Sequence, residues 1–528
     1  MITGRAIYQK YVYMSNQADS IKKRFGVTLF ADIVRLAINI VKSAIVPRVL
    51  GASDYGSFEF LLASFRSMRS FLDLGSSAAF FTYNSKRDKS DIVVVVYSGW
   101  MLIQVVVIMT FISLTVIGGF NDYIWPDQLP TYVWLIAGVE FVGFVSTLFV
   151  SLGDSIRITV TVRIISIVVN VFVALLILLL FLLDQLSLDK YIVVNYLNFT
   201  LVCVVIAYVL LRNSKTHFVL NWSKSRIKDI LSYFWRYCHP LIVYTFVGFV
   251  VSFFERWLLQ FVGGSVEQGY YSLAHKWASI SLIFTTSIIN IYWKETAYSY
   301  GANDLVRLTT LYKKTNVLLF GLASVIGIFI FTHSKRLVLI VAGSEYKAAI
   351  TPFMIMAFYP LHQTIGQLNG TFFYATERTK LRRNLGIVVM LTGLVLTYFL
   401  LAPKNNVVPG FGLGAIGLAV KTVSCNIFGV NLMMFFNTRF LNERFRPFLL
   451  NQVFVIVIYL LISGLTYYPV KSILNLIGIS SDIVFILVHG VLYISGVAFL
   501  VYRHPVILGL TRNDFNKITV EIRRRFLG

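Results

Sequence analysis

Charged side chains are scarce in this chain of 528 residues. Asp, Glu, Lys and Arg make up 13% of it and hydrophobic residues 57%, whereas an ordinary soluble protein is about 25% charged. A soluble chain of this length would form several domains, and too few charges are present to cover their surfaces. The apolar residues instead gather in blocks of about twenty, the length of helix that crosses the ~30 Å hydrocarbon core of a bilayer. The composition therefore predicts a membrane protein.

Cysteines and catalytic motifs are scarce as well. The three cysteines, Cys203, Cys238 and Cys425, lie far apart, which argues against a metal-ligand set or a disulfide framework. The sequence has no phosphate-binding Gly-x-x-x-x-Gly-Lys-Ser/Thr motif, and no paired carboxylates in a loop large enough to shape a site. We therefore predict no enzyme activity, no metal and no cofactor. Without a nucleotide site, an ion gradient or substrate flow must supply the energy for any transport.

Basic residues outnumber acidic ones, 47 to 24. In a soluble protein this excess would suggest nucleic acid, but cytoplasmic loops of membrane proteins are enriched in Lys and Arg, so we expect no nucleic-acid partner. The first 25 residues are polar and basic, with no short apolar run before a cleavage site, which argues against a removed signal peptide.

Fourteen apolar blocks are candidate membrane spans. They lie at 26–48, 57–82, 92–119, 131–153, 158–183, 191–211, 240–262, 269–293, 315–332, 348–374, 384–402, 412–437, 451–468 and 482–502. Lys and Arg concentrate in the two termini and in alternate loops, which predicts that both termini are cytoplasmic. The exception is Lys335, Arg336 and Lys347, which fall on the outer side after the ninth span. All outer loops are short, which counts against membrane glycosyltransferases, polymerases and ligases.

The same pattern predicts how the chain is organised. It gives a basic cytoplasmic N-terminus (1–25), an N-lobe of spans 1–6 (26–212), a basic cytoplasmic linker (213–238), a C-lobe of spans 7–12 (239–438), spans 13 and 14 (451–502) and a basic cytoplasmic tail (503–528). The linker is predicted to form a helix on the surface of the inner leaflet.

A short motif occurs once in each predicted lobe. Gly51 and Gly56 lie five residues apart with an acid between them and an apolar helix directly after, and Gly264 and Gly269 repeat this pattern. The offset of 213 residues equals six spans, which predicts parallel repeats related by an axis along the membrane normal. Transporters often bind substrate between such repeats.

Several motifs resemble one family. Val46-Pro-Arg-Val-Leu-Gly51, with Tyr55-Gly56 behind it, resembles the first hairpin of polysaccharide-repeat-unit flippases of the Wzx type, which serve O-antigen, capsule and exopolysaccharide synthesis. His239-Pro240, Gly269-Tyr-Tyr-Ser-Leu-Ala274 and Gly412-Leu-Gly-Ala-Ile-Gly-Leu-Ala419 are similar to the family at matching places. Glu255-Arg256 departs from the family's usual Asp-Arg by one methylene. The superfamily, the multidrug/oligosaccharidyl-lipid/polysaccharide exporters, also holds multidrug and toxic compound exporters and lipid II flippases.

The resemblance implies an all-α polytopic membrane protein with two six-helix lobes related by pseudo-two-fold symmetry and two further C-terminal helices. It implies a transporter of the bacterial inner membrane that flips an undecaprenyl-diphosphate-linked oligosaccharide by alternating access, coupled to H⁺ or Na⁺. Membrane lipids, a polysaccharide polymerase and a chain-length regulator are the implied partners. Three alternatives stay open: a multidrug or cation exporter of the same fold, a lipid II flippase and, less favoured, a membrane polymerase or acyltransferase.

Charged residues interrupt the first two spans. An Asp, Lys or Arg at the centre of a membrane helix costs roughly 2.5–3.5 kcal/mol on insertion scales, so such residues usually face a cavity or a partner. The first span has Asp32, Arg35 and Lys42 on one face, and the second has Glu59, Arg66, Arg69 and Asp73. Either the two stripes line a cavity, or they are ion pairs that only hold the helices together. In the second case Arg66 would neutralise Glu59 or Asp73.

Cations exceed acids within the spans, and a diphosphate would offset the difference because guanidinium forks bind phosphate oxygens in pairs. The residues predicted to bind the diphosphate and sugars are Arg35, Lys42, Arg66, Arg69, Arg256, Lys276 and Lys421. The acids predicted as ion-coupling sites are Asp32, Asp73, Glu140 and Glu255. In the tenth span, His362, Gln363, Gln367 and Asn369 form a polar face that either touches sugar hydroxyls or bonds between helices, and the second role is favoured. We expect His489 to pack between helices.

Overall fold

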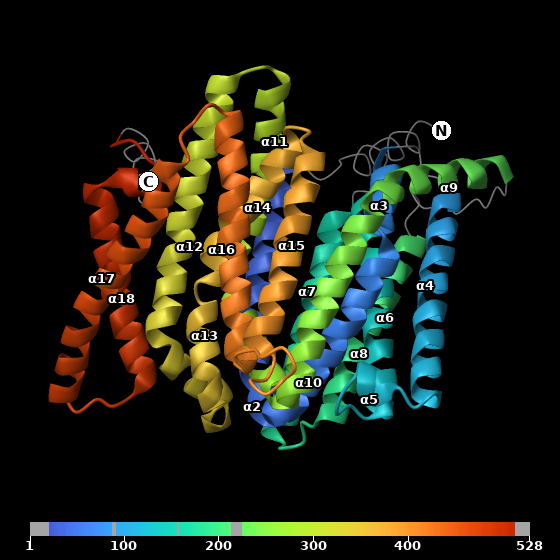
Figure 1. The fold of residues 1–528 in the computed structure, drawn as a ribbon, viewed down its shortest axis with the longest axis horizontal. Helices are drawn as coiled ribbons and strands as arrows, with labels where there is room; N and C mark the ends of the chain where they lie inside the picture. Colours follow the sequence, from blue (N-terminus) through green and yellow to red (C-terminus); the bar gives the residue numbers. More distant parts are fainter. Residues whose placement is uncertain (1–20, 87–90, 156–157, 213–223, 513–528) are drawn as a thin grey trace, which may run out of the picture. The chain divides into compact units, whose positions relative to one another are not determined.

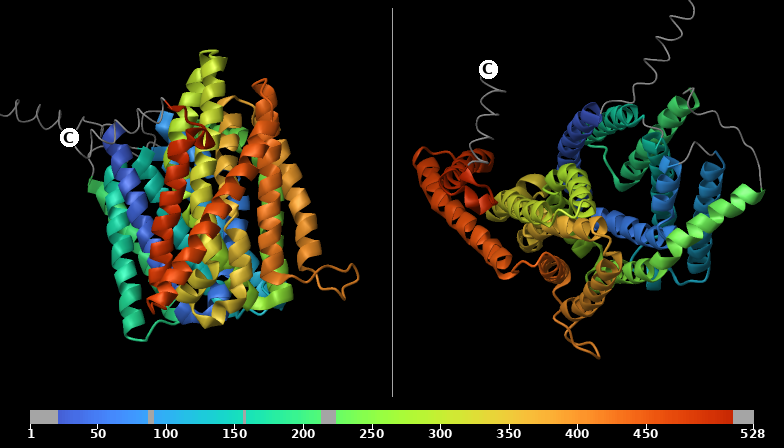
Figure 2. Two further views of the ribbon diagram at one scale, coloured as in Figure 1. Left: turned by 90° about the vertical axis from the view of Figure 1, so that its left-hand side faces the viewer. Right: turned by 90° about the horizontal axis from the view of Figure 1, so that it is seen from above.

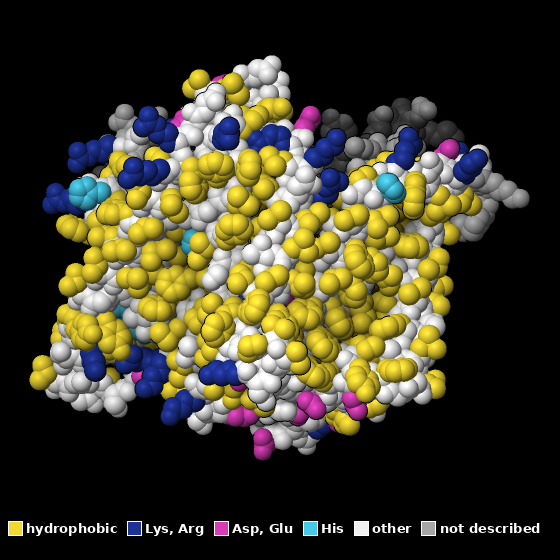
Figure 3. Space-filling model, viewed as in Figure 1, with side chains coloured by type: hydrophobic (Ala, Val, Ile, Leu, Met, Phe, Trp, Pro, Cys, Tyr) yellow, Lys and Arg dark blue, Asp and Glu magenta, His cyan; other side chains and the backbone are white. Residues whose placement is uncertain are grey.

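The structure, a computed structural model, describes residues 21–86, 91–155, 158–212 and 224–512. Every regular element in these ranges is a helix (Figure 1). Hydrophobic side chains cover the middle of the helices, while Lys and Arg gather toward their ends (Figure 3). The basic segments 1–20 and 513–528 lie outside the described residues. The prediction of an all-α membrane protein is confirmed.

Among the described residues, eleven helices are long and apolar enough to cross a membrane. Two of them, α2 (Ile21–Asp73) and α10 (Ile242–Ile280), are each a pair of helices joined across a kink. The short helices α13 (Ile350–Met356) and α14 (Tyr359–Ala375) together cover the predicted tenth span. With the two kinked helices counted as pairs and α13–α14 as one span, the helices account for the fourteen predicted spans.

The chain divides into two compact units, and the first comprises Met1–Leu50 and Ser57–Trp257. Its helices besides α2 and the start of α10 are α3 (Ser76–Lys86), α4 (Asp91–Ile117), α5 (Asn121–Ile124), α6 (Pro130–Ser155), α7 (Thr159–Leu182), α8 (Leu188–Arg212) and α9 (Lys224–Cys238), followed by the 3-10 turn η1 (His239–Leu241). Helix α8 packs against both α6 and α7.

Helix α9 lies in the segment predicted as a linker and runs across the ends of α3 and α4 (Figure 1). Its inner face carries aromatic side chains: Tyr233 packs on Tyr83 and Phe234 on Tyr97, with ring centroids 5.1 and 6.4 Å apart. Trp235 is exposed. Such an amphipathic helix suits the interface of a membrane.

The second unit comprises Gly51–Gly56 and Leu258–Gly528. Its helices besides the end of α10 and the pair α13–α14 are α11 (Ile283–Gly301), α12 (Leu305–Ala342), α15 (Thr379–Leu401), α16 (Gly414–Phe440), α17 (Arg446–Leu476) and α18 (Asp482–Arg503), with the 3-10 turns η2 (Ser344–Ala349) and η3 (Pro505–Leu508). Helices α12, α14 and α16 enclose a buried core, and α17 and α18 pack on α12 (Figure 2).

The kinks of α2 and α10 have the same backbone conformation. Gly51 has φ 71° and ψ 174°, and Gly264 has φ 68° and ψ −171°. Residues with a side chain rarely adopt a positive φ, whereas glycine adopts it readily because it has no Cβ. The repeated motif therefore specifies the same bend in both halves of the sequence.

The second glycines of the motif, Gly56 and Gly269, allow two backbones to approach. A Cβ on Gly56 would collide with the carbonyl oxygen of Ser265, and a Cβ on Gly269 with that of Ala52. Next to this crossing, the backbone N–H of Ala52 donates to Glu345 Oε1 at 2.8 Å. The spacing of five residues thus places one glycine at the bend and the other at the crossing.

Helix α12 is longer than the predicted ninth span of 315–332. It begins after Asp304, whose side chain accepts from the backbone N–H of Arg307, and it ends at Ala342. Two tertiary ion pairs allow charged residues inside this helix: Lys313 Nζ lies 2.6 Å from Glu443, and Arg336 Nε lies 2.8 Å from Asp482. The prediction placed both charges in connections outside the ninth span, and the structure shows that helix α12 continues through them.

His489 packs between helices, as expected. Its Nε2 lies 3.1 Å from the carbonyl oxygen of Ser463, and its Nδ1 lies 2.7 Å from Nε2 of His333. A carbonyl only accepts, so Nε2 of His489 carries the proton and Nδ1 accepts from His333. Both histidines are fully buried, and the pair links α18 to α12 and α17.

Candidate functional site

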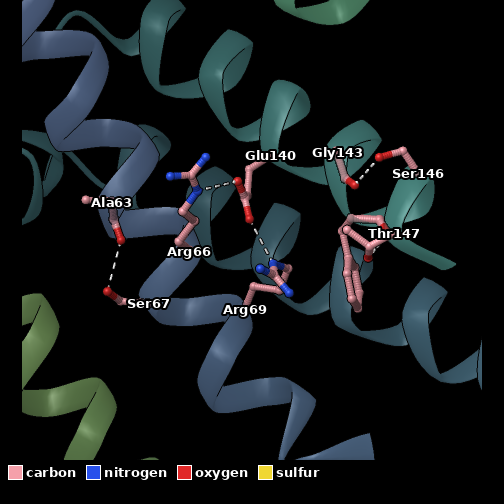
Figure 4. A network of polar contacts seen from close by, with 9 residues as sticks. Ala63, Arg66, Ser67, Arg69, Glu140, Gly143, Ser146 and Thr147 are labelled. Carbon is pink, nitrogen blue, oxygen red and sulfur yellow. Dashed lines mark hydrogen bonds and ion pairs between the residues drawn. The ribbon is translucent and has the colours of Figure 1, made fainter. Parts of the chain in front are cut away.

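Two arginines of α2 share one carboxylate of α6 (Figure 4). Nε of Arg66 donates to Glu140 Oε2 at 3.2 Å, and Nε of Arg69 donates to Glu140 Oε1 at 2.8 Å. Positions 66 and 69 lie one turn apart on the same helix face, so both side chains reach α6. We call these three residues the arginine cluster.

The carboxylate of this cluster is buried and the guanidiniums extend outward. The Glu140 side chain is 9% exposed, against 55% for Arg66 and 27% for Arg69. The Arg69 guanidinium also lies 4.7 Å from the ring centroid of Phe144, within cation–π range. Glu140 therefore orients both arginines, and Phe144 further orients Arg69.

Each arginine bonds Glu140 through its Nε atom. Among the described residues, Glu140 is the polar partner of both guanidiniums, and no other residue bonds their terminal Nη groups. Two cations against one acid leave the cluster with a formal charge of +1. Paired Nη groups match the oxygens of a phosphate, so the cluster can bind an oxyanion.

The other predicted cations of the first unit lie outside this cluster. Arg35 and Lys42 belong to the first part of α2 and Arg256 to α10, and all three are partly buried. Within the described part of the chain, none of them contacts Glu140. Of the five substrate-binding residues predicted in this unit, Arg66 and Arg69 share one carboxylate.

Two predicted cations belong to the second unit. The ammonium of Lys276 lies 5.0 Å from the ring centroid of Tyr55, which is a cation–π distance. Lys421 is buried on α16 beside α15, where a Cβ on Gly393 would lie 3.0 Å from Lys421 Cε. The absence of a side chain at Gly393 makes room for the lysine.

The four predicted coupling acids have different surroundings. Glu140 holds the two arginines. The carboxylate of Asp73 accepts from the hydroxyls of Ser76 and Ser77 at 2.8 and 2.7 Å and from the backbone N–H of Ser77, so it caps α3. Glu255 is partly buried in α10, and the side chain of Asp32 lies outside the described residues.

The structure corrects the predicted partner of Arg66. The ion-pair alternative assigned it to Glu59 or Asp73, its heptad neighbours on the same span, but its partner is Glu140. The pair lies 74 residues apart in sequence, so helix spacing alone does not indicate it. One signal was available: Glu140 is the only acid inside its predicted span, and a buried acid needs a cation.

Comparisons with known proteins agree on fold and family. Residues 21–292 match the protein family described as "Polysaccharide biosynthesis protein". No curated protein matches the sequence. The fold is similar to that of the lipid II flippase MurJ in an inward closed conformation, with a TM-score of 0.62 and 14% identity over 90% of this chain and 98% of that one.

Two other solved transporters are also similar. A multidrug resistance MATE family transporter of the MOP superfamily, in an inward-facing conformation, has a TM-score of 0.58 and 16% identity over 78% of this chain and 95% of that one. A MOP superfamily transporter from Pyrococcus furiosus has a TM-score of 0.54 and 12% identity over 80% of this chain and 96% of that one. At these identities the likeness establishes the fold and leaves the substrate to be argued from the residues.

Proposed function

The chain belongs to the polysaccharide biosynthesis protein family, and from that premise we propose that it flips an undecaprenyl-diphosphate-linked oligosaccharide repeat unit across the bacterial inner membrane. The headgroup of such a lipid carries a diphosphate and several sugars, which cannot enter hydrocarbon unpaired. A transporter of this fold supplies a polar path by alternating access. A polysaccharide polymerase, with its chain-length regulator, would then consume the delivered unit.

The arginine cluster is the observation that carries this proposal. It offers the Nη groups of two guanidiniums inside a membrane protein, on a buried carboxylate that neutralises only one of them. An oxyanion completes the charge balance, and a diphosphate has enough oxygens to engage both forks. We assign Arg66 and Arg69 to the diphosphate and keep Arg35, Lys42, Arg256, Lys276 and Lys421 as further cations along the path.

Ion coupling by H⁺ or Na⁺ is part of the proposal, and Asp32, Asp73, Glu140 and Glu255 are its candidate acids. Glu140 is held by two guanidiniums and Asp73 by the start of α3. A carboxylate with such partners is poorly placed to exchange an ion in each cycle, so Glu140 and Asp73 are the weaker candidates. We further propose that both termini are cytoplasmic.

Two alternative substrates are an organic cation, whose charge is opposite to that of a diphosphate, and lipid II, which would use the same diphosphate chemistry. An exporter of organic cations would need acids in its site, and the positive charge of the arginine cluster opposes that role. A lipid II flippase would use the same diphosphate chemistry, and the MurJ-like fold favours it as the second candidate. Expression in a strain without its polysaccharide flippase and in a strain depleted of MurJ separates the two: we expect rescue of the first and not of the second.

The substitution Arg66→Ala tests the diphosphate role. We expect it to block export of surface polysaccharide in a flippase-deficient strain while the protein stays in the membrane. Arg66→Lys should restore export in part, because the charge returns without the fork. If Arg66 served only to neutralise Glu140, Arg69 would still pair with that carboxylate in Arg66→Ala, and full export by this single variant would refute the proposal.

A further inference from the structure

Helix α14 carries two different polar faces. One is buried: Asn369 accepts from the hydroxyl of Tyr312 at 2.6 Å and donates to Asn316 Oδ1 at 2.9 Å. Asn437 of α16 donates to Asn369 as well. His362 is buried on this same side. This face bonds between helices, which is the role that the sequence favoured for all four polar residues of the tenth span.

The other face holds Gln363, Gln367 and Tyr374, at spacings of four and seven residues that place them on one side of the helix. All three are at least partly exposed. Among the described residues, the side-chain amides of Gln363 and Gln367 have no hydrogen-bond partner, and neither has a fully buried polar atom. An unpaired amide costs roughly 4–8 kcal/mol in a medium that forms no hydrogen bonds, so this face contacts water rather than lipid tails.

A neighbouring helix of the same unit shows what a lipid-facing surface looks like here. The exposed side chains along α15 include Val388, Leu391, Val395 and Phe399. None of these has a polar group to satisfy. The contrast with Gln363 and Gln367 makes the second polar face of α14 a surface for a polar ligand.

Aromatic rings extend this face onto α11. Trp293 stacks on Tyr374 with ring centroids 6.0 Å apart and an interplanar angle of 27°, and the two side chains are 46% and 47% exposed. Gly370 lies between Gln367 and Tyr374, and a Cβ there would lie 3.4 Å from Nε of Arg382. That Nε is buried and has no hydrogen-bond partner among the described residues. The absence of a side chain at Gly370 makes room for this guanidinium of α15 against α14.

We propose that Gln363, Gln367, Tyr374 and Trp293 form a sugar-binding face. Amides donate and accept hydrogen bonds and so pair with hydroxyl groups of either kind. Exposed aromatic rings offer a flat apolar surface with a polar tip, which fits the apolar side of a sugar ring. The inference rests on the proposed function and assigns the oligosaccharide to residues separate from those that hold the diphosphate.

The test compares two soluble probes on full-length protein in lipid nanodiscs. One probe is inorganic diphosphate. The other is the repeat oligosaccharide released by mild acid from the surface polysaccharide of the native host. Binding of the oligosaccharide is measured by saturation-transfer NMR, and diphosphate binding by calorimetry. The variants are Gln363→Leu with Gln367→Leu, and Trp293→Leu. The matched control is Trp235→Leu, which removes an exposed tryptophan of α9.

The double leucine variant should lose about tenfold in oligosaccharide affinity, as two neutral hydrogen bonds predict, and should bind diphosphate as wild type does. Trp293→Leu should weaken the oligosaccharide signal, whereas Trp235→Leu should not. Two results would refute the sugar-binding face and leave the proposed function standing. In the first, the double variant binds the oligosaccharide as wild type does. In the second, wild type binds diphosphate but does not bind the oligosaccharide. If wild type binds neither probe, the proposed function fails with it.

Discussion

Replacing Glu140 by Gln removes the shared counter-ion of Arg66 and Arg69 and keeps the size of the side chain. The two arginines bond different oxygens of Glu140. In the amide one of these oxygens is replaced by an NH₂ group, which only donates, so one guanidinium loses its acceptor. Loss of one partner of a buried pair costs about 3–5 kcal/mol, a range that applies best to Arg69, whose pair is short and mostly buried. The Arg66 pair is half exposed and screened, so it contributes about 0–1 kcal/mol.

An anion should reverse this loss. In the variant the formal charge of the cluster rises from +1 to +2, and a bound diphosphate then replaces the carboxylate as counter-ion. We expect Glu140→Gln to unfold at a lower temperature than wild type without anion, and to gain more thermal stability from added diphosphate than wild type gains. Export should fall nevertheless, because an anion held more tightly leaves more slowly.

The assay is thermal unfolding of purified protein across a diphosphate titration. Asp154→Asn is the matched control, since it breaks the Arg163–Asp154 pair, which is similarly part-buried and has no role in the proposed site. Its diphosphate response should equal that of wild type. Equal diphosphate-induced shifts in Glu140→Gln, Asp154→Asn and wild type would show that the arginine cluster does not bind the anion.

Three further predictions concern packing, topology and coupling. Gly56→Ala should sharply reduce folded protein in the membrane, because its Cβ collides with a backbone oxygen, whereas Gly99→Ala, with open space around it, should be neutral or stabilising by up to about 1 kcal/mol; detergent-extracted yield and thermal stability check both. A reporter that is active only outside the membrane should be active when fused after Asp184 and silent after Arg383, and swapped results would overturn the proposed orientation. Glu255→Gln should abolish the pH dependence of transport in proteoliposomes at normal protein levels, and if pH-dependent transport persists Glu255 is only a structural counter-ion.

Much of the fold could be predicted from the sequence because a bilayer restricts the choices. Backbone groups in hydrocarbon must bond within their own helix, so long apolar blocks indicate α4, α6, α7 and α8 directly. The repeated glycine motif could be found too, since a positive φ and a backbone crossing both require glycine. The ends of α12 were harder, because Lys313 and Arg336 resemble loop residues until Glu443 and Asp482 are seen beside them.

The candidate site depended on contacts that no local pattern contains. Heptad spacing placed Arg66 on one stripe with Glu59 and Asp73, but a carboxylate of another helix, 74 residues away, holds it. Helical periodicity predicts which residues share a face of one helix. It does not predict which face of another helix packs against that face.

The same limit applies to α14. Its sequence has His362, Gln363, Gln367 and Asn369 within eight positions. Only packing separates them, with Asn369 bonded inside the bundle and Gln363 and Gln367 partly exposed. The sequence by itself predicted that this protein lies in a membrane, crosses it about fourteen times and has more cations than acids within the spans. Only the tertiary structure decided which acid pairs with Arg66 and Arg69, because that depends on distances between helices that are far apart in the chain.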